Sequence, residues 1–149
     1  MTGEKMWQEY CLITNTDINT RHDLWKFCDG GIFADELANL VLEGIKKATS
    51  STKLSYEING EELPQKGTYS VILFDNDEAA CIIRDTKVSV VPFWQVSATH
   101  AYQEGEDDRS LEKWREVHFR TFAADYEVAG LNFDESCNCV LEEFEVVYR

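Results

Sequence analysis

The stretch Tyr69–Val91, YSVILFDNDEAACIIRDTKVSVV, decides how this chain folds. Two segments rich in apolar residues, 69–74 and 79–91, flank the tripeptide Asp75-Asn76-Asp77. Asp and Asn tolerate left-handed backbone geometry, and so short a loop joins two strands only in antiparallel orientation. The later part of the second segment alternates between apolar and polar side chains, as a half-buried strand does. We therefore predict a β-hairpin at the centre of the fold.

Helices and one further strand are expected around this hairpin. The sequence patterns predict helices over about 4–14, 33–46, 97–104 and 111–127, and a last strand over about 139–148. The segment after Ala48, rich in Ser and Thr, is expected to be extended. Ser97 and Ser110 stand where N-cap residues are expected for the third and fourth helices. Because helices and strands occur in mixed order, we predict an α+β fold. A small mixed or antiparallel β-barrel with peripheral helices is the simplest such arrangement.

Length and apolar content indicate one folded domain. The chain has 149 residues, of which 44% are hydrophobic, and we expect a single domain over residues 1–149. No apolar run approaches the roughly 18–20 residues that cross a bilayer. The first ten residues, MTGEKMWQEY, lack the basic start and apolar core of a signal peptide. The expected location is therefore the cytoplasm, with no membrane partner.

The strong negative charge limits which partners the chain can bind. Lys and Arg number 14 against 28 Asp and Glu, which gives a net charge of −14. Binding of long nucleic acids depends on neutralisation of phosphates by basic side chains. We therefore expect no extended nucleic-acid surface, whereas one nucleotide in a local basic pocket remains compatible with this charge.

The cysteines predict neither a disulfide framework nor a metal site. They number five and are irregularly spaced, at Cys11, Cys28, Cys81, Cys137 and Cys139. The pair Cys137-x-Cys139 lacks the second Cys pair or nearby His that would complete a zinc set. We accordingly expect reduced thiols, no metal and no cofactor.

Two lysines and a group of hydroxyls follow the second predicted helix, in Gly44–Ser51, GIKKATSS. One interpretation is that Lys46 and Lys47 end the helix, where cations interact favourably with its dipole. The alternative is a small site in which Lys46 activates the hydroxyl of Thr49. A desolvated lysine can act as such a base. Taken alone, the spacing favours the helix-end interpretation.

Other polar side chains also have two interpretations. His100 and Glu104 lie one helical turn apart and share a face, either as a surface pair or as part of a site with Glu104 as the acid. His118 falls on the apolar face of the last helix, where a hydrogen-bonded core histidine is the simpler interpretation. Arg115 either pairs with one of the many acids or holds a ligand oxygen.

Two aromatic side chains precede the turn at 28–31. Trp25 and Phe27 either belong to the core or stack on a nucleobase. The chain contains no G-x-G-x-x-G, Walker, G-x-S-x-G or H-E-x-x-H motif. The common nucleotide, hydrolase and metalloprotease signatures therefore do not assign it a reaction.

Several segments together resemble a known family. They are ADELANLVLEG (34–44), the motif Gly44-x-Lys46-x-x-Thr49, VVPFWQVSATHAYQEGEDDRSLEKWREVH (90–118) and FEVVY (144–148). In them the chain is similar to the larger bacterial branch of the ASCH domain family, from about Trp25 to Tyr148. The family signature G-x-K-x-x-T-x-R ends in Arg, where this chain has Ser51. The resemblance implies a PUA-like mixed or antiparallel β-barrel with flanking helices, and makes residues 1–24 an N-terminal helical extension.

The resemblance also implies a function. The family is suggested to bind RNA or nucleotide-like ligands beside its motif, and some members are amidohydrolases of N4-acetylcytidine. By analogy Thr49 is the nucleophile, Lys46 the base and Glu104, from the segment His100-Ala-Tyr-Gln-Glu104, the acid or orienting group. For ligand binding we expect contributions from Gly44, Lys47, Trp25, Phe27, His100 and Arg115.

The expected ligand is a nucleoside, a nucleotide or a short RNA. Three alternatives to the amidohydrolase stay open: a non-catalytic RNA- or nucleotide-binding module, a ribonuclease, and a structural or regulatory partner of the translation machinery. The net charge of −14 favours a nucleoside-sized ligand but does not distinguish turnover from binding.

Overall fold

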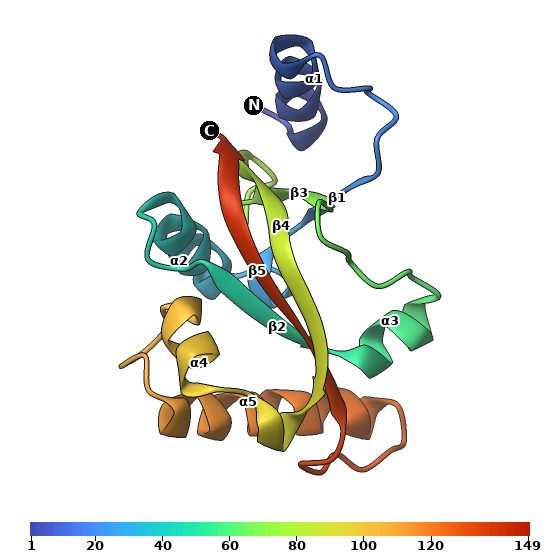
Figure 1. Ribbon diagram of the computed structural model, residues 1–149, viewed down its shortest axis with the longest axis vertical. Helices are drawn as coiled ribbons and strands as arrows, with labels where there is room; N and C mark the ends of the chain where they lie inside the picture. The colour runs from blue at the N-terminus through green and yellow to red at the C-terminus, as the bar shows by residue number, and fades with distance from the viewer. The chain divides into compact units, whose positions relative to one another are not determined.

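The computed structural model describes residues 1–149. Its elements, in chain order, are α1 (Gly3–Thr14), β1 (His22–Trp25), the 3-10 helix η1 (Phe27–Asp29), α2 (Ile32–Leu42), β2 (Ala48–Thr52), α3 (Lys53–Asn59), β3 (Tyr69–Leu73), β4 (Ala79–Pro92), the 3-10 helix η2 (Phe93–Gln95), α4 (Ala98–Glu104), α5 (Leu111–Val128) and β5 (Asn138–Tyr148) (Figure 1). The mixed order of helices and strands confirms the α+β class.

The predicted hairpin is confirmed, and it lies within a sheet of five strands. β3 and β4 pair in antiparallel orientation, with Tyr69 opposite Arg84. β1 runs parallel to β3, and β2 runs antiparallel to β5. The strand order is β1-β3-β4-β5-β2. The sheet is thus mixed, as predicted, but it is open, and the expected closure into a barrel is not seen.

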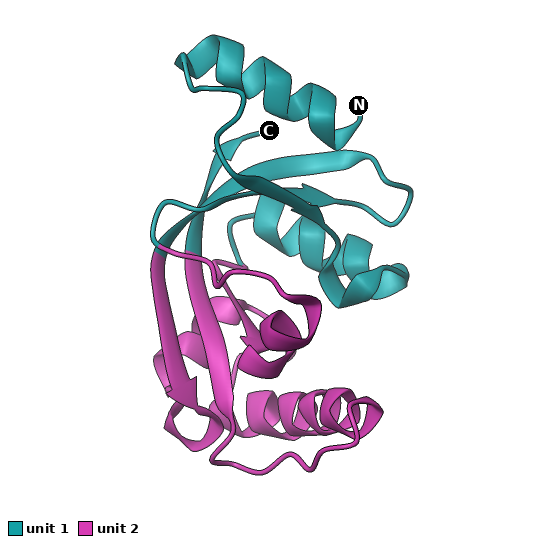
Figure 2. Ribbon diagram, turned by 90° about the vertical axis from the view of Figure 1, so that its right-hand side faces the viewer, with its two compact units in different colours: residues 1–45, 66–86, 144–149 teal, residues 46–65, 87–143 magenta.

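The chain divides into two compact units (Figure 2). Unit 1 comprises residues 1–45, 66–86 and 144–149, and unit 2 comprises residues 46–65 and 87–143. Strands β4 and β5 each contribute residues to both units. Lys46, Thr49 and Glu104 all belong to unit 2, as do α4 and α5.

In unit 1 the hairpin buries both of its faces. Ile72 and Cys81 pack in one apolar cluster with residues of α2, whereas Val71 and Ile82 pack in another with residues of α1. Neighbouring residues of a strand point to opposite faces, so the two helices cover opposite sides of β3 and β4. The buried residues of α1 are Gly3, Met6, Trp7, Tyr10 and Cys11. Their helical spacing is why the predicted first helix forms here.

In unit 2 the core forms around the aromatic face of α5. Trp114 and Phe122 pack there with Phe93 of η2 and Ala101 of α4. Ser97 and Ser110 cap α4 and α5 by accepting hydrogen bonds from backbone N–H groups, which confirms both predicted caps. The caps fix where these helices begin, and so which of their side chains face the core.

Three features differ from the predictions. Helix α2 ends at Leu42, and Gly44 follows with φ of +75°. Lys46 and Lys47 therefore lie in the connection to β2, and the helix-end interpretation is wrong. The short strand β1 was not predicted, and neither was α3, which begins after the cap Thr52. Helix α3 buries none of its residues, so it lacks the apolar periodicity by which helices are recognised.

None of the helices is both long and apolar enough to span a membrane. None of the five cysteines forms a disulfide. Three of them, Cys11, Cys81 and Cys139, are buried, and burial raises the pKa of the Cys81 and Cys139 thiols to about 12. These two thiols stay protonated at neutral pH, and a protonated thiol is a poor nucleophile and metal ligand.

We predict that neither a reductant nor a metal chelator changes the melting temperature by more than a few degrees. Loss of a structural disulfide would cost about 2–5 kcal/mol and would be visible in a thermal melt followed by circular dichroism. Untreated protein in the same buffer is the control. A larger fall on either treatment would reveal a cross-link or a metal that contributes to folding.

Candidate functional site

The side chain of Lys46 is buried in unit 2 with only 1% of it exposed. Its Nζ donates to the carbonyl oxygens of Ala48, at 2.8 Å, and Glu104, at 3.3 Å. It also lies 3.4 Å from Oε1 of Glu104 and 2.8 Å from Oε2 of Glu106. A buried charge is tolerated when it is paired and hydrogen-bonded, and these acceptors meet that requirement. The next residue, Lys47, bonds through its backbone N–H to Gln103, which ties this segment to α4.

Glu104 is the acceptor at the centre of the site. Its Oε2 accepts hydrogen bonds from Ser50 Oγ at 2.6 Å and from Trp114 Nε1, and lies 3.0 Å from His100 Nε2. Because a carboxylate has no proton to give, His100 Nε2 must be the donor in this contact. The donors come from β2, α4 and α5, so one carboxylate connects three elements of unit 2.

The environment of Glu104 keeps it ionised. Burial by itself would raise the pKa of this carboxyl, but the charge of Lys46, and then the hydrogen bond from His100, outweigh that effect. The pKa is therefore lowered from its ordinary value. Glu104 is thus a permanently charged acceptor at neutral pH.

His118 completes the surroundings of Glu104. Its ring stacks on Trp114 with centroids 4.2 Å apart, and its Nδ1 lies 2.9 Å from the backbone oxygen of Trp114. Nδ1 must therefore carry a proton, and Nε2, which is 3.7 Å from Glu104 Oε1, carries one only when the ring is cationic. The prediction of a hydrogen-bonded histidine on the apolar face of this helix is confirmed.

The hydroxyl that contacts Glu104 belongs to Ser50 and not to Thr49. In the register of β2 and β5, Ser50 lies opposite Leu141 and Thr49 lies opposite Glu142. Successive side chains of a strand point to opposite faces, so Thr49 lies on the other face of β2 from Ser50. The alternation within residues 48–52 was the signal that could have identified Ser50.

Ser50, His100 and Glu104 do not form a Ser-His-acid relay. In such a relay the histidine uses one ring nitrogen for the nucleophile and the other for the acid. Here His100 Nε2 lies 2.8 Å from Ser50 Oγ and 3.0 Å from Glu104 Oε2, so the same nitrogen faces both partners. The three groups form a closed hydrogen-bonded triangle, which positions Glu104.

The other predicted ligand-binding residues do not take part in this network as the structure describes it. Trp25 and Phe27 stack edge to face within unit 1, where Phe27 is buried in the apolar core. Gly44 belongs to the turn that ends α2, and the Lys47 side chain is exposed. Arg115 is exposed and reaches the backbone oxygen of Trp94 at 3.5 Å. Of the predicted set, Lys46, His100 and Glu104 come together, whereas Thr49 lies on the opposite face of β2 from Ser50 and makes none of the hydrogen bonds described for this network.

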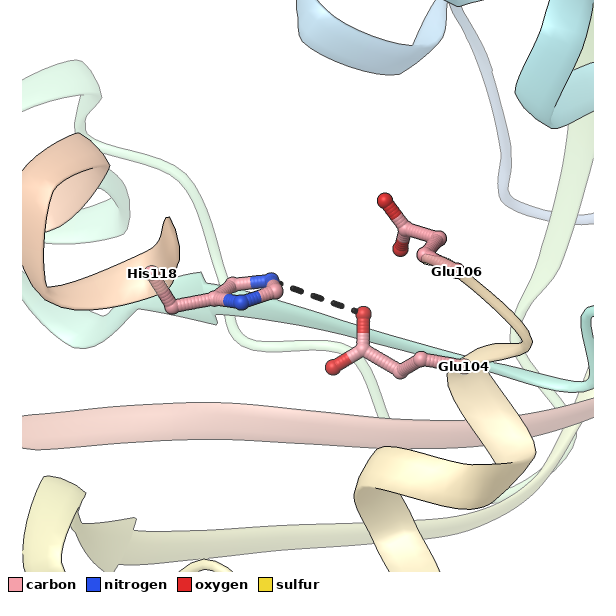
Figure 3. A group of neighbouring side chains, drawn as sticks. All are labelled: Glu104, Glu106 and His118. Atoms are coloured by element: carbon pink, nitrogen blue, oxygen red, sulfur yellow. Dashed lines mark ion pairs between the residues drawn. The ribbon is translucent and has the colours of Figure 1, made fainter. Parts of the chain in front are cut away.

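Three side chains in the site have the chemistry of metal ligands. One ligand atom each from Glu104, Glu106 and His118 lies within 4.8 Å of the others (Figure 3). Carboxylates and imidazole suit several divalent ions. The Lys46 ammonium, however, already lies beside both carboxylates. A metal would have to displace this cation, so the residues fit an ion only if Lys46 withdraws.

A small cavity of about 220 Å³ opens next to His100. It is lined by Lys87, Ser89, Ser97, Thr99, His100, Leu141 and Glu143, all of which belong to unit 2. Most of these side chains carry hydroxyl or charged groups. Its volume is below the ~300–1,000 Å³ typical of sites for drug-sized ligands, so it suits a small polar group.

Comparison with known proteins identifies the family. Residues 23–148 match the sequence model of the ASCH domain. The chain belongs to the ASCH domain family. The ASCH domain of Lactobacillus crispatus JV V101 has a similar structure, with a TM-score of 0.91 and 33% identity over 99% of this chain and 94% of that one. A protein from Enterococcus faecalis V583 gives a TM-score of 0.87 and 34% identity over 97% and 87% of the two chains. No curated protein matches the sequence.

For this ASCH domain we predict that Glu104→Gln lowers stability at neutral pH and flattens its acid dependence. A carboxyl whose folded pKa is lowered contributes stability above its ordinary pKa of 4.5, and that stability is lost as pH falls below this value. The substitution leaves the buried Lys46 without one partner, which costs about 3–5 kcal/mol. Thermal melts between neutral pH and pH 3 would measure both effects.

Glu116→Gln is the matched control for this substitution. Glu116 lies on α5, 3.7 Å from Lys113, and its side chain is 64% exposed. An exposed pair of this kind contributes at most about 1 kcal/mol. Equal loss of stability in the two variants would contradict the central position assigned to Glu104.

Proposed function

We propose that this ASCH domain binds a single RNA base or modified nucleoside beside Lys46 and Glu104. The observation that carries the proposal is the buried contact between these two residues, which are 58 positions apart in sequence. Burying a charged pair is costly, so such pairs are weak evidence for stability alone and stronger evidence for a site. Members of the family are generally thought to bind RNA, which agrees with this ligand class.

The net charge of the chain and the volume of the cavity beside His100 both limit the size of the proposed ligand. At a net charge of −14 the surface repels a long phosphate backbone. The cavity beside His100, of about 220 Å³, has room for a small polar group and not for a chain of nucleotides. Both observations favour recognition of one nucleoside by hydrogen bonds over recognition of a strand by its phosphates.

We predict that long single-stranded RNA binds weakly and that this binding disappears near 0.15 M salt. Few basic side chains are available to release counterions from the RNA, so the electrostatic contribution is small. Fluorescence anisotropy of an unstructured RNA over a series of salt concentrations would test this, with a basic RNA-binding domain as positive control. Submicromolar affinity at physiological salt would mean that a basic stripe exists on the folded surface.

Amide hydrolysis is the reaction we propose for this site. It is favoured by one specific observation, the contact of Lys46 with Glu104, which are two of the three residues that the family resemblance makes catalytic. In this proposal the ligand brings Lys46 toward the face of β2 that carries Thr49, and the Thr49 hydroxyl attacks the carbonyl carbon of an N-acylated base. Lys46 accepts the hydroxyl proton and a carboxyl assists the leaving nitrogen. Because the described partners of Lys46 in unit 2 are acceptors, the ligand must rearrange these contacts before Lys46 can take a proton.

We predict that the protein hydrolyses N4-acetylcytidine or another N-acylated nucleoside and that Thr49→Ala lowers kcat about 100-fold or more. The melting temperature of Thr49→Ala should stay within a few degrees of wild type. Product release would be followed by liquid chromatography. Lys46→Ala is a less informative variant, because it also leaves the buried Glu104 charge without its main partner.

Ser50→Ala is the matched control, since it removes the neighbouring hydroxyl from the opposite face of β2. It should lower stability by about 1–3 kcal/mol, because Glu104 loses a donor, and should retain turnover below its melting temperature. The opposite result, with Ser50→Ala inactive and Thr49→Ala active, would make Ser50 the attacking group. No hydrolysis of any N-acylated nucleoside by wild type would refute the reaction and leave binding to be measured by calorimetry.

A further inference from the structure

We propose that Glu106, and not Glu104, is the carboxylate that reaches a ligand held at Lys46. This inference rests on the proposed function and concerns which of the two carboxylates contacts the ligand. Both carboxylates contact the same ammonium, at 2.8 Å for Glu106 and 3.4 Å for Glu104. The two side chains differ in their exposure to solvent and in their other hydrogen-bond partners, and these differences determine which carboxylate can contact a ligand.

Glu104 is held on all sides by the protein. Its side chain is 2% exposed, and its Oε2 is engaged by Ser50, His100 and Trp114. Its Oε1 faces Lys46 and His118. To meet a ligand it would have to leave donors from three different elements, which would then be buried without a partner. Glu104 is therefore a positioning residue for Lys46 and for the elements around it.

Glu106 has the access that Glu104 lacks. Its side chain is 25% exposed, and it lies in the loop that follows α4 rather than in the helix itself. In Figure 3 a dashed line joins the Glu104 carboxylate to His118, whereas no such line reaches the Glu106 carboxylate. Gly105, Asp107 and Arg109 in this loop have positive φ values of 73°, 53° and 63°. This backbone turns the chain sharply and brings the Glu106 carboxylate back onto Lys46.

The contact between Lys46 and Glu106 suits proton transfer in amide hydrolysis. As Thr49 Oγ bonds to the carbonyl carbon, Lys46 passes one ammonium proton across the 2.8 Å contact to Glu106 and accepts the Thr49 proton in its place. Glu106 gives this proton to the leaving nitrogen as the C–N bond breaks. Water then attacks the acyl group on Thr49, a proton of that water returns to Thr49 Oγ through the same groups, and the acid product leaves. Both residues end as they began.

The main test compares Glu106→Gln with Asp107→Asn, the loss of an exposed carboxylate at the next position of the same loop. Glu106→Gln should lower kcat on N4-acetylcytidine about 100-fold or more. The assay is run well below the melting temperature of the variant, because the substitution also removes one of the two carboxylate partners of the buried Lys46 and so lowers stability. Asp107→Asn should leave both unchanged. A Glu106→Gln variant with wild-type kcat would overturn the proposal.

A second measurement separates this inference from the proposed reaction. Reductive methylation of Lys46, followed by mass spectrometry, reports how readily its amine is reached without any turnover. Glu106→Gln should speed modification of Lys46 about tenfold or more, because a charge-assisted contact that shields the amine is lost, whereas Asp107→Asn should not. Addition of N4-acetylcytidine should slow modification in the Glu106→Gln variant.

The outcomes of the two measurements are distinguishable. If wild type hydrolyses no N-acylated nucleoside but Glu106→Gln exposes Lys46 and the nucleoside protects it, the reaction fails and Glu106 remains the ligand-side carboxylate. If Lys46 is modified at the same slow rate in Glu106→Gln as in wild type, the inference is overturned whether or not the reaction occurs.

Discussion

The buried pair of Lys46 and Glu104 is the constraint on which the arrangement of unit 2 depends. Both side chains are almost fully withdrawn from water, and neither charge could be buried at this depth without the other. Lys46 enters from the segment before β2, and Glu104 is the last residue of α4. The pair therefore fixes the position of this helix end against the start of the strand.

The hydrogen bonds around the pair extend this constraint to the rest of unit 2. Ser50 anchors β2 to Glu104, and Trp114 anchors α5. Because Trp114 also packs in the apolar core with Phe93 and Phe122, polar and apolar interactions favour the same placement of the helix. A network whose polar groups have their hydrogen-bond partners is expected to be rigid. Groups that contact the proposed ligand are therefore expected at the edge of the network, where Glu106 and the cavity beside His100 lie.

Signals that are local in sequence predicted much of the fold, and long-range pairing accounts for the rest. The turn Asp75–Asp77 sufficed for the hairpin, and the two serine caps sufficed for the starts of α4 and α5. Strand β1 has only four residues and forms because β3 is available beside it, which no local pattern reveals. The early end of α2 was missed because apolar residues continue past Leu42 to Ile45, while Gly44 adopts the positive φ that ends the helix. In the site, Lys46 and Glu104 were predictable from the family resemblance. Ser50 was missed although strand alternation separates it from Thr49, and Glu106 could not be found because its contact with Lys46 depends on a loop conformation.

Lys46 and Lys47 show why composition alone could not place the site. They are adjacent and chemically identical, yet one is buried among acceptors and the other is exposed. Burial of Lys46 is possible because two carboxylates, those of Glu104 and Glu106, lie beside it. The consequence is that this positive charge is not displayed to solvent as an attractor of phosphates. In the proposed function a ligand reaches Lys46 by replacing a carboxylate oxygen with one of its own, and selection then depends on the geometry of a single acceptor group and not on the charge of a nucleic-acid backbone.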